Sequence, residues 1–191
     1  MIVVSGLPRS GTSLMMQMLE AGGLEILTDR IRTADESNPQ GYYELEKVKE
    51  LDKGGDTSWL EGSRGKAVKI IAFLLRHLPD TLNYRVIFMQ RDLHEIIASQ
   101  NKMLAQRGET SDTDDDRVMD AFKQHLLRTR SMVTSRDCFQ SLDVSYNVVL
   151  EEPAAQAKRV SDFLGGTLDV ESMAAVVNPE LYRNRAQRAA D

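Results

Sequence analysis

The chain has 191 residues, of which 41% are hydrophobic, and this predicts one globular domain over residues 1–191. A net charge of −5 argues against general nucleic-acid binding. A single cysteine, Cys138, excludes a disulfide framework, and three scattered histidines argue against a metal site. No apolar run approaches the roughly 20 residues that cross a bilayer, and no basic segment precedes the first apolar residues. We therefore expect a cytoplasmic protein without a membrane span or signal peptide.

The first predicted elements surround a glycine loop. Residues 1–4 are apolar and predict a strand, and residues 12–21 have an apolar face and predict a helix. Between them lies Gly6-Leu-Pro-Arg-Ser-Gly-Thr-Ser13, in which two glycines allow the backbone to wrap around a phosphate. The helix start adds unpaired N–H groups and the positive end of a dipole. The segment predicts an anion-binding loop, with an ordinary strand-to-helix turn as the alternative.

The cation of this loop is not where nucleoside-triphosphate enzymes have theirs. Those loops carry Lys after the second glycine, where this chain has Thr12, and the cation here is Arg9. Arginine offers a planar fork that suits a phosphate or sulfate. Three hydroxyls and the helix-start backbone complete the predicted anion-binding set, which is Arg9, Ser10, Gly11, Thr12 and Ser13.

The rest of the chain alternates strands and helices. We expect strands over residues 24–27, 66–71, 84–90 and 142–146, and helices over 42–53, 71–78, 92–107, 115–135 and 152–164. Residues 84–90 are apolar on both faces, which is typical of a parallel strand covered by helices. The acidic run over 109–116 is interpreted as a helix start with a solvated loop rather than a lid over an acceptor. The pattern predicts an α/β fold with a mainly parallel sheet covered on both faces.

A second anion signal follows the strand over 84–90. Arg91 ends this strand, at the edge of the sheet where ligands bind in such folds. Ser99 comes eight residues later on the next helix, and Asp92 and Ser99 lie on the same side of that helix. Arg91 and Ser99 could therefore grip one anion. The alternatives are a solvated strand end and a serine without a role.

Three motifs resemble those of the sulfotransferase family and occur in its order. Gly6-Leu-Pro-Arg-Ser-Gly-Thr-Ser13 resembles the loop for the 5′-phosphosulfate of the donor. Arg91-Asp-Leu-His-Glu-Ile-Ile-Ala-Ser99 resembles the 3′-phosphate motif, with Arg and Ser at the same separation. Tyr146-Asn-Val-Val-Leu-Glu-Glu-Pro153, running on to Phe163-Leu-Gly165, resembles the family's Tyr-acid-Leu-acid-Pro segment and its following helix.

The resemblance implies a three-layer, P-loop NTPase-like fold and a PAPS-dependent sulfotransferase. The donor would be 3′-phosphoadenosine 5′-phosphosulfate (PAPS) and the product adenosine 3′,5′-bisphosphate (PAP). An acceptor hydroxyl or amine would attack the sulfur in line, while Arg9 and the amides of residues 11–13 stabilise the charge that grows in the transition state. A sulfuryl group carries less charge than a phosphoryl group, so no metal is expected.

The resemblance also implies a carboxylate base. Asn38-Pro-Gln-Gly-Tyr-Tyr-Glu44 resembles a stretch of some bacterial sulfotransferases, and in several branches an acid from this region accepts the proton. We expect Glu44 to be the base, with Glu46 as its nearest competitor and a helix-start role as the alternative. The aryl and steroid branch uses a His shortly after a strand Lys, but the run here is Lys69-Ile-Ile-Ala. That departure disfavours membership of that branch.

Further basic residues complete the predicted site. Lys69 is expected to reach the sulfuryl group, unless it is a solvated strand end. In the family a basic C-terminal segment helps to hold the 3′-phosphate, and Arg183 and Arg185 are the candidates, with a solvated tail as the alternative.

The acceptor is expected to lie against the loops over residues 28–43, 54–65 and 108–116. Trp59 and Tyr42 could stack on it or belong to the core. A carbohydrate, a lipid and a small hydroxylated metabolite all remain open as acceptors. Two rival functions are a P-loop kinase of a small metabolite, which needs Lys at position 12 and a metal-binding Asp, and a non-catalytic nucleotide-binding protein.

Overall fold

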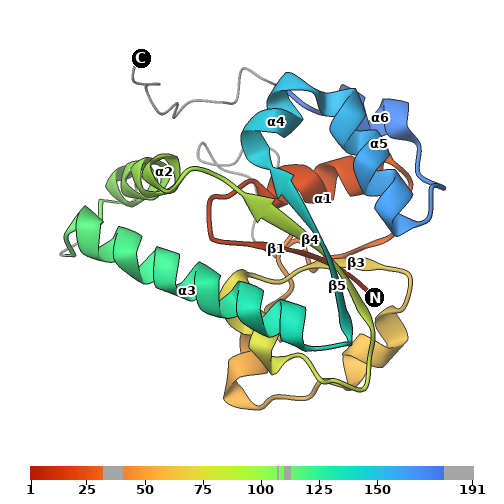
Figure 1. Ribbon diagram of the computed structural model, residues 1–191, viewed down its shortest axis with the longest axis horizontal. Coiled ribbons are helices and arrows are strands. Elements are labelled where there is room, and N and C mark those ends of the chain that lie inside the picture. Colours follow the sequence, from red (N-terminus) through yellow and green to blue (C-terminus); the bar gives the residue numbers. More distant parts are fainter. Residues whose placement is uncertain (32–40, 107, 110–112, 179–191) are drawn as a thin grey trace.

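A computed structural model of the chain describes residues 1–31, 41–106, 108–109 and 113–178. Five parallel strands form one sheet in the order β2-β3-β1-β4-β5 (Figure 1). Their bounds are β1 Ile2–Gly6, β2 Ile26–Leu27, β3 Ala67–Lys69, β4 Tyr84–Gln90 and β5 Phe139–Ser145. The predicted α/β class with a mainly parallel sheet is confirmed.

Helices cover both faces of the sheet (Figure 1). One face packs against α1 (Thr12–Ala21), α4 (Tyr146–Glu151), α5 (Pro153–Leu164) and α6 (Val170–Ala175). The other packs against α3 (Asp115–Ser135) and three 3₁₀ helices, η1 (Glu46–Lys53), η2 (Ser58–Ser63) and η3 (Ala72–His77). The helix α2 (Leu93–Gln106) follows β4. This confirms the predicted three-layer arrangement.

The side chains of β1 point alternately into two hydrophobic cores, one on each face of the sheet. Val4 faces α1 and Val3 faces the opposite side, because successive strand side chains point to opposite faces. The α1 side is rich in methionine, and Met15 and Met18 are fully buried there. These flexible thioethers fill the space between helix and sheet.

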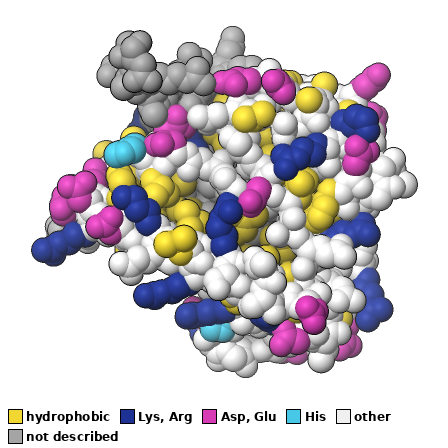
Figure 2. Space-filling view, in the orientation of Figure 1, with side chains coloured by type: hydrophobic (Ala, Val, Ile, Leu, Met, Phe, Trp, Pro, Cys, Tyr) yellow, Lys and Arg dark blue, Asp and Glu magenta, His cyan; other side chains and the backbone are white. Residues whose placement is uncertain are grey.

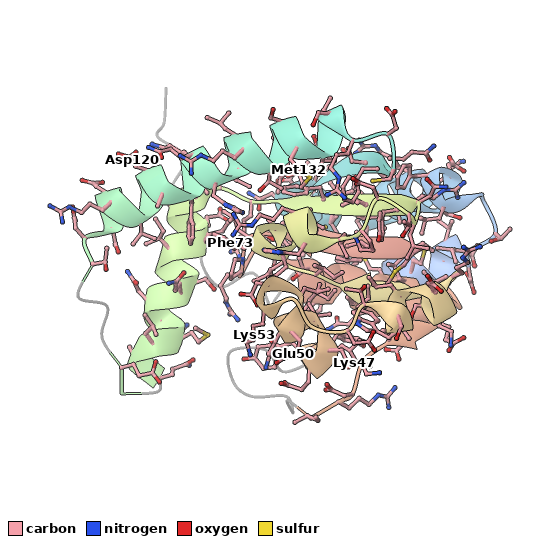
Figure 3. All side chains as sticks on the ribbon, turned by 90° about the horizontal axis from the view of Figure 1, so that it is seen from below. Lys47, Glu50, Lys53, Phe73, Asp120 and Met132 are labelled. Atoms are coloured by element: carbon pink, nitrogen blue, oxygen red, sulfur yellow. The ribbon has the colours of Figure 1, made fainter. Side chains whose placement is uncertain are left out.

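Aromatic contacts hold η3 against α3 on the opposite side. The Phe73 ring of η3 (labelled in Figure 3) stacks on the His125 ring of α3 with centroids 3.7 Å apart. Thr129 and Val133 are buried one turn and two turns further along α3 and form a stripe that faces the core. Lys47, Glu50 and Lys53 of η1 lie on the outer surface (Figure 3).

Some predicted elements differ from the structure, and some observed elements were not predicted. The helix expected over 42–53 is a 3₁₀ helix that begins at Glu46, because Tyr43 has a left-handed backbone and Leu45 an extended one. The strand expected over 142–146 spans Phe139–Ser145, and Tyr146 begins α4 instead. Two short helices, α4 and α6, were not predicted. In the part of the chain that the structure describes, no helix has the length and apolar character needed to cross a membrane.

Basic and acidic side chains are interspersed on the face drawn in Figure 2, with apolar groups between them. The sheet determines where the candidate site lies, because parallel strands bring their carboxyl ends to one edge. The register pairs Val4 with Lys69 of β3, and Gly6 with Met89 of β4. The glycine loop, Lys69 and Arg91 therefore gather at the same edge of the sheet.

Candidate functional site

The loop between β1 and α1 depends on its two glycines. Gly6 and Gly11 have φ values of 148° and 98°. A Cβ on Gly6 would lie 2.5 Å from Ser10 Oγ, and one on Gly11 would lie 2.3 Å from the Tyr146 ring. Arg9 also has a positive φ, of 68°. A non-glycine residue in this region is uncommon and points to a constrained, functional turn.

The inside of the loop presents hydrogen-bonding groups to a ligand. Ser10 is 1% exposed, and its Oγ has no partner among the described residues. A buried hydroxyl without a partner costs free energy, which an anion in the loop would offset. The helix α1 begins at Thr12 behind this hydroxyl, and its first amides have no intrahelical acceptor. These features fit the phosphate or sulfate that the sequence predicts.

Arg9 forms hydrogen bonds with both Arg91 and Ser99. Arg9 Nε donates a hydrogen bond to Ser99 Oγ at 3.0 Å. Arg91 donates from its guanidinium to the backbone carbonyl of Arg9 at 3.2 Å. Sequence reasoning placed Arg91 and Ser99 on one anion, and the structure brings them together through Arg9.

A buried framework orients Arg91. Its Nε donates to Glu95 Oε2 at 2.9 Å, and the two side chains are only 7% and 2% exposed. The guanidinium also lies over the Tyr146 ring, with Cζ 4.5 Å from the ring centre. Burial raises the pKa of the Tyr146 phenol, so the ring is neutral at physiological pH. The alternative of a solvated strand end is wrong for Arg91.

Tyr146 thus touches both halves of the site, because it packs on Gly11 as well as on Arg91. Tyr146 belongs to a motif predicted from the sequence but had no predicted role, and Glu95 was not predicted as a site residue. Arg91 lies just before α2 and Glu95 is in its first turn, four residues later, and this spacing is a signal that could have revealed the pair.

Glu44 lies beside Lys69 at the neighbouring strand end. Glu44 Oε1 is 3.9 Å from Lys69 Nζ, and Glu44 Oε2 is 3.8 Å from Lys49 Nζ. Lys69 is buried and donates to the backbone carbonyl of Tyr42. Ser13 Oγ donates to the same carbonyl at 3.4 Å. The segment that carries Glu44 is thereby joined to α1 and β3, and Lys69 is not a solvated strand end.

The remaining predicted residues fall into three groups. Tyr42 is buried and Trp59 packs against the core cluster on the α3 side, so the core alternative holds for both. Glu46 is exposed and pairs with Lys49 at 2.6 Å. Arg183 and Arg185, and the start of the motif at Asn38, lie outside the described residues.

A family model described as "Sulfotransferase family" matches residues 51–169, more than half of the chain. The chain belongs to the sulfotransferase family. The matched segment contains Lys69, the whole Arg91–Ser99 motif and Tyr146. Sulfotransferase membership was predicted from three motifs, of which the glycine loop lies outside the matched segment, and the prediction is confirmed. A search of curated proteins gave no significant match.

Solved structures add a comparison of folds. A sulfotransferase domain from the curacin biosynthetic pathway aligns with 90% of this chain and 75% of its own, at 16% identity and a TM-score of 0.52. At that identity the likeness shows the fold alone. An unliganded sugar kinase from Janibacter sp. HTCC2649 aligns with 94% of this chain and 96% of its own, at 12% identity. Its TM-score of 0.40 is too low to carry an argument.

Proposed function

We propose that this sulfotransferase-family chain transfers a sulfuryl group from PAPS to an acceptor hydroxyl or amine. The observation that carries the proposal is the joining of two arginines at the glycine loop, where Arg91 donates to the Arg9 carbonyl and Arg9 donates to Ser99. Two arginines at the same edge of the sheet suit a ligand with separate anionic groups.

The donor would lie across these two groups of residues. Its 5′-phosphosulfate would occupy the glycine loop, against Ser10, Gly11, Thr12, Ser13 and the Arg9 side chain. Its 3′-phosphate would lie against Arg91 and Ser99, with Arg183 and Arg185 as further proposed contacts. The buried Ser10 hydroxyl and the close packing at Gly6 support this fit, because both leave the loop shaped for an oxyanion rather than a side chain.

The reaction would be an in-line displacement at sulfur. A bond forms from the acceptor oxygen or nitrogen to sulfur, and the bond from sulfur to the 5′-phosphate oxygen breaks. That oxygen leaves with the electron pair as part of PAP. Arg9 and the amides at the start of α1 would stabilise the charge that grows on it. No metal takes part in this proposal.

The proposed base is Glu44, which would accept the acceptor's proton. Its carboxylate lies within 4 Å of Lys69 Nζ, and the Tyr42 carbonyl ties the same lysine to the Glu44 segment. Lys69 is at the strand end next to the glycine loop, so we propose that it contributes positive charge near the sulfuryl group. Small-molecule, carbohydrate and lipid acceptors are all compatible with this chemistry.

The test is transfer of labelled sulfur. Purified chain is incubated with [³⁵S]PAPS and a phenol, a long-chain alcohol or a disaccharide, and labelled product is separated from donor. We expect label in at least one acceptor, with PAP formed in equal amount. Tight PAP binding without transfer to any acceptor of a wider panel would favour a non-catalytic nucleotide-binding protein instead.

A further inference from the structure

The segment that carries Glu44 contains a strained residue with a specific partner. Tyr43 has a φ of 52°, in the left-handed region. Its hydroxyl donates to Glu20 Oε2 at 2.5 Å, and the other oxygen of Glu20 accepts from Arg30 at 3.3 Å. Arg30 is left-handed as well, with a φ of 55°. Such a backbone is unfavourable for a residue other than glycine, so surrounding contacts must hold it.

The carboxylate of Glu20 links this segment to the helix that begins at the glycine loop. Glu20 is in the last turn of α1, and the first turn of the same helix follows Gly11. A helix is a rigid spacer, so a residue fixed to its last turn is also fixed relative to the anion loop. Tyr43 immediately precedes Glu44 and has this connection.

Other contacts fix the backbone of Glu44 to the segment that follows β2. Its carbonyl accepts from Thr28 Oγ1 at 2.9 Å and from the Asp29 amide at 3.1 Å. The Asp29 carboxylate accepts from the Glu46 amide at 2.6 Å. The Tyr43 hydroxyl adds the contact to α1, and together they determine where the Glu44 side chain leaves the backbone.

We propose that Tyr43 and Glu20 are positioning residues, which hold the Glu44 carboxylate in place relative to the glycine loop. This inference rests on the proposed function, in which Glu44 is the base. The Tyr43 hydrogen bond is charge-assisted and short, and bonds of this kind are the stronger ones. The Arg30–Glu20 ion pair has side chains 79% and 39% exposed, and exposed pairs contribute little. Both contacts to Glu20 are exposed, but only the tyrosine hydroxyl joins the residue next to Glu44 to α1.

The first test is Tyr43→Phe, which keeps the ring and removes the hydroxyl. We expect kcat for [³⁵S]PAPS transfer to fall about tenfold, since small misplacements of a catalytic group are costly. The KM for PAPS and the calorimetric affinity for PAP should stay unchanged, because Arg91 and the loop are intact. Tyr84→Phe is the matched control: its hydroxyl donates to the Pro79 carbonyl at 3.0 Å at the amino end of β4. That variant should keep the wild-type kcat.

Glu20→Ala should reproduce the loss in kcat, and the double variant with Tyr43→Phe should be no worse than either single change, because both remove one contact. Equal kcat in wild type and Tyr43→Phe, or a fall in PAP affinity in place of kcat, would overturn the inference. Losses that add in the double variant would also overturn it.

Hydrogen exchange gives a readout that does not depend on turnover. In Tyr43→Phe, amides of residues 42–48 should exchange faster than in wild type, and in Tyr84→Phe they should not. Unchanged exchange of residues 42–48 in Tyr43→Phe would show that the Tyr43–Glu20 hydrogen bond does not hold this segment. That result would overturn the inference even if wild type transferred no label. An inactive wild type with faster exchange in the variant would instead refute Glu44 catalysis, and with it the positioning role.

Discussion

Arg9 and Ser99 are 90 residues apart in the chain, and the 3.0 Å hydrogen bond from Arg9 Nε to Ser99 Oγ joins the glycine loop to α2. The two proposed anion subsites therefore form one connected structure. Arg91 strengthens the connection, since its guanidinium reaches the Arg9 carbonyl. A ligand that binds one subsite thus contacts residues whose positions depend on the other.

Arg91→Ala should weaken PAP binding by about 1.5–3 kcal/mol, the range for a hydrogen bond to a charged group. Titration calorimetry measures this directly. The variant should also unfold more easily, because Glu95 would be left buried without its cation. Arg85→Ala is a control on β4, the strand that Arg91 follows, where the exposed side chain donates to the Leu164 carbonyl. Wild-type affinity in Arg91→Ala would contradict the site assignment.

Gly11→Ala should abolish measurable PAP binding and lower the melting temperature, because the new Cβ would overlap the Tyr146 ring. Gly23→Ala separates this clash from backbone strain. Gly23 has a similar positive φ of 90°, but its Cβ would meet nothing within 4 Å. It should cost only the strain, about 1–2 kcal/mol, and leave PAP binding intact. Similar behaviour of the two variants would show that the ring contact has no role.

Glu44→Gln should keep PAP affinity and lose turnover by about 10²–10⁴-fold, the usual contribution of a general base. The change preserves shape and removes only the charge. The comparison variant is Glu46→Gln, since Glu46 pairs with the same Lys49 but is exposed. We expect its turnover to match wild type. If Glu46→Gln rather than Glu44→Gln lost turnover, the base would be Glu46.

The Asp29 carboxylate should contribute to stability in a pH-dependent way. The backbone amides of Ile31 and Glu46 donate to it and hold its pKa below the ordinary value of 3.8. A depressed folded-state pKa means that the stabilisation is complete above the ordinary value and is lost as the pH falls through the folded value. Asp29→Asn should therefore lower the free energy of unfolding at pH 7, and the gap to wild type should close below about pH 3.8. Chemical denaturation of both proteins at pH 7 and below about pH 3.8 measures this difference in the free energy of unfolding. A difference that stayed constant between the two pH values would contradict the predicted role of the Asp29 carboxylate.

The sequence predicted correctly those helices and strands whose first and last residues are determined by residues within or next to them. The bounds of α1, β4 and α3 were predicted as observed, because the glycines, the apolar run and the aspartates that mark them act locally. The segment Tyr146–Glu151 was different. Its two adjacent valines favour a strand, yet it is the helix α4, since packing of Tyr146 and Val149 into the core outweighs the local preference.

The site was predictable residue by residue but not in its connections. Arg9, Arg91 and Ser99 could be named from motif spacing, while the bond between Arg9 and Ser99 depends on the way the sheet brings the ends of β1 and β4 together. The hydrogen bond between Tyr43 and Glu20 depends on the left-handed backbone conformation of Tyr43. Non-glycine residues adopt that conformation too rarely for a sequence pattern to reveal it.

The measurement that tests the central claim most directly is a calorimetric titration of the purified chain with PAP, with ADP and with ATP plus Mg²⁺. The account predicts that PAP binds selectively, without metal, and that its affinity falls in Arg91→Ala. A preference for ATP that requires Mg²⁺ would contradict the 3′-phosphate site and favour a kinase-type use of the glycine loop.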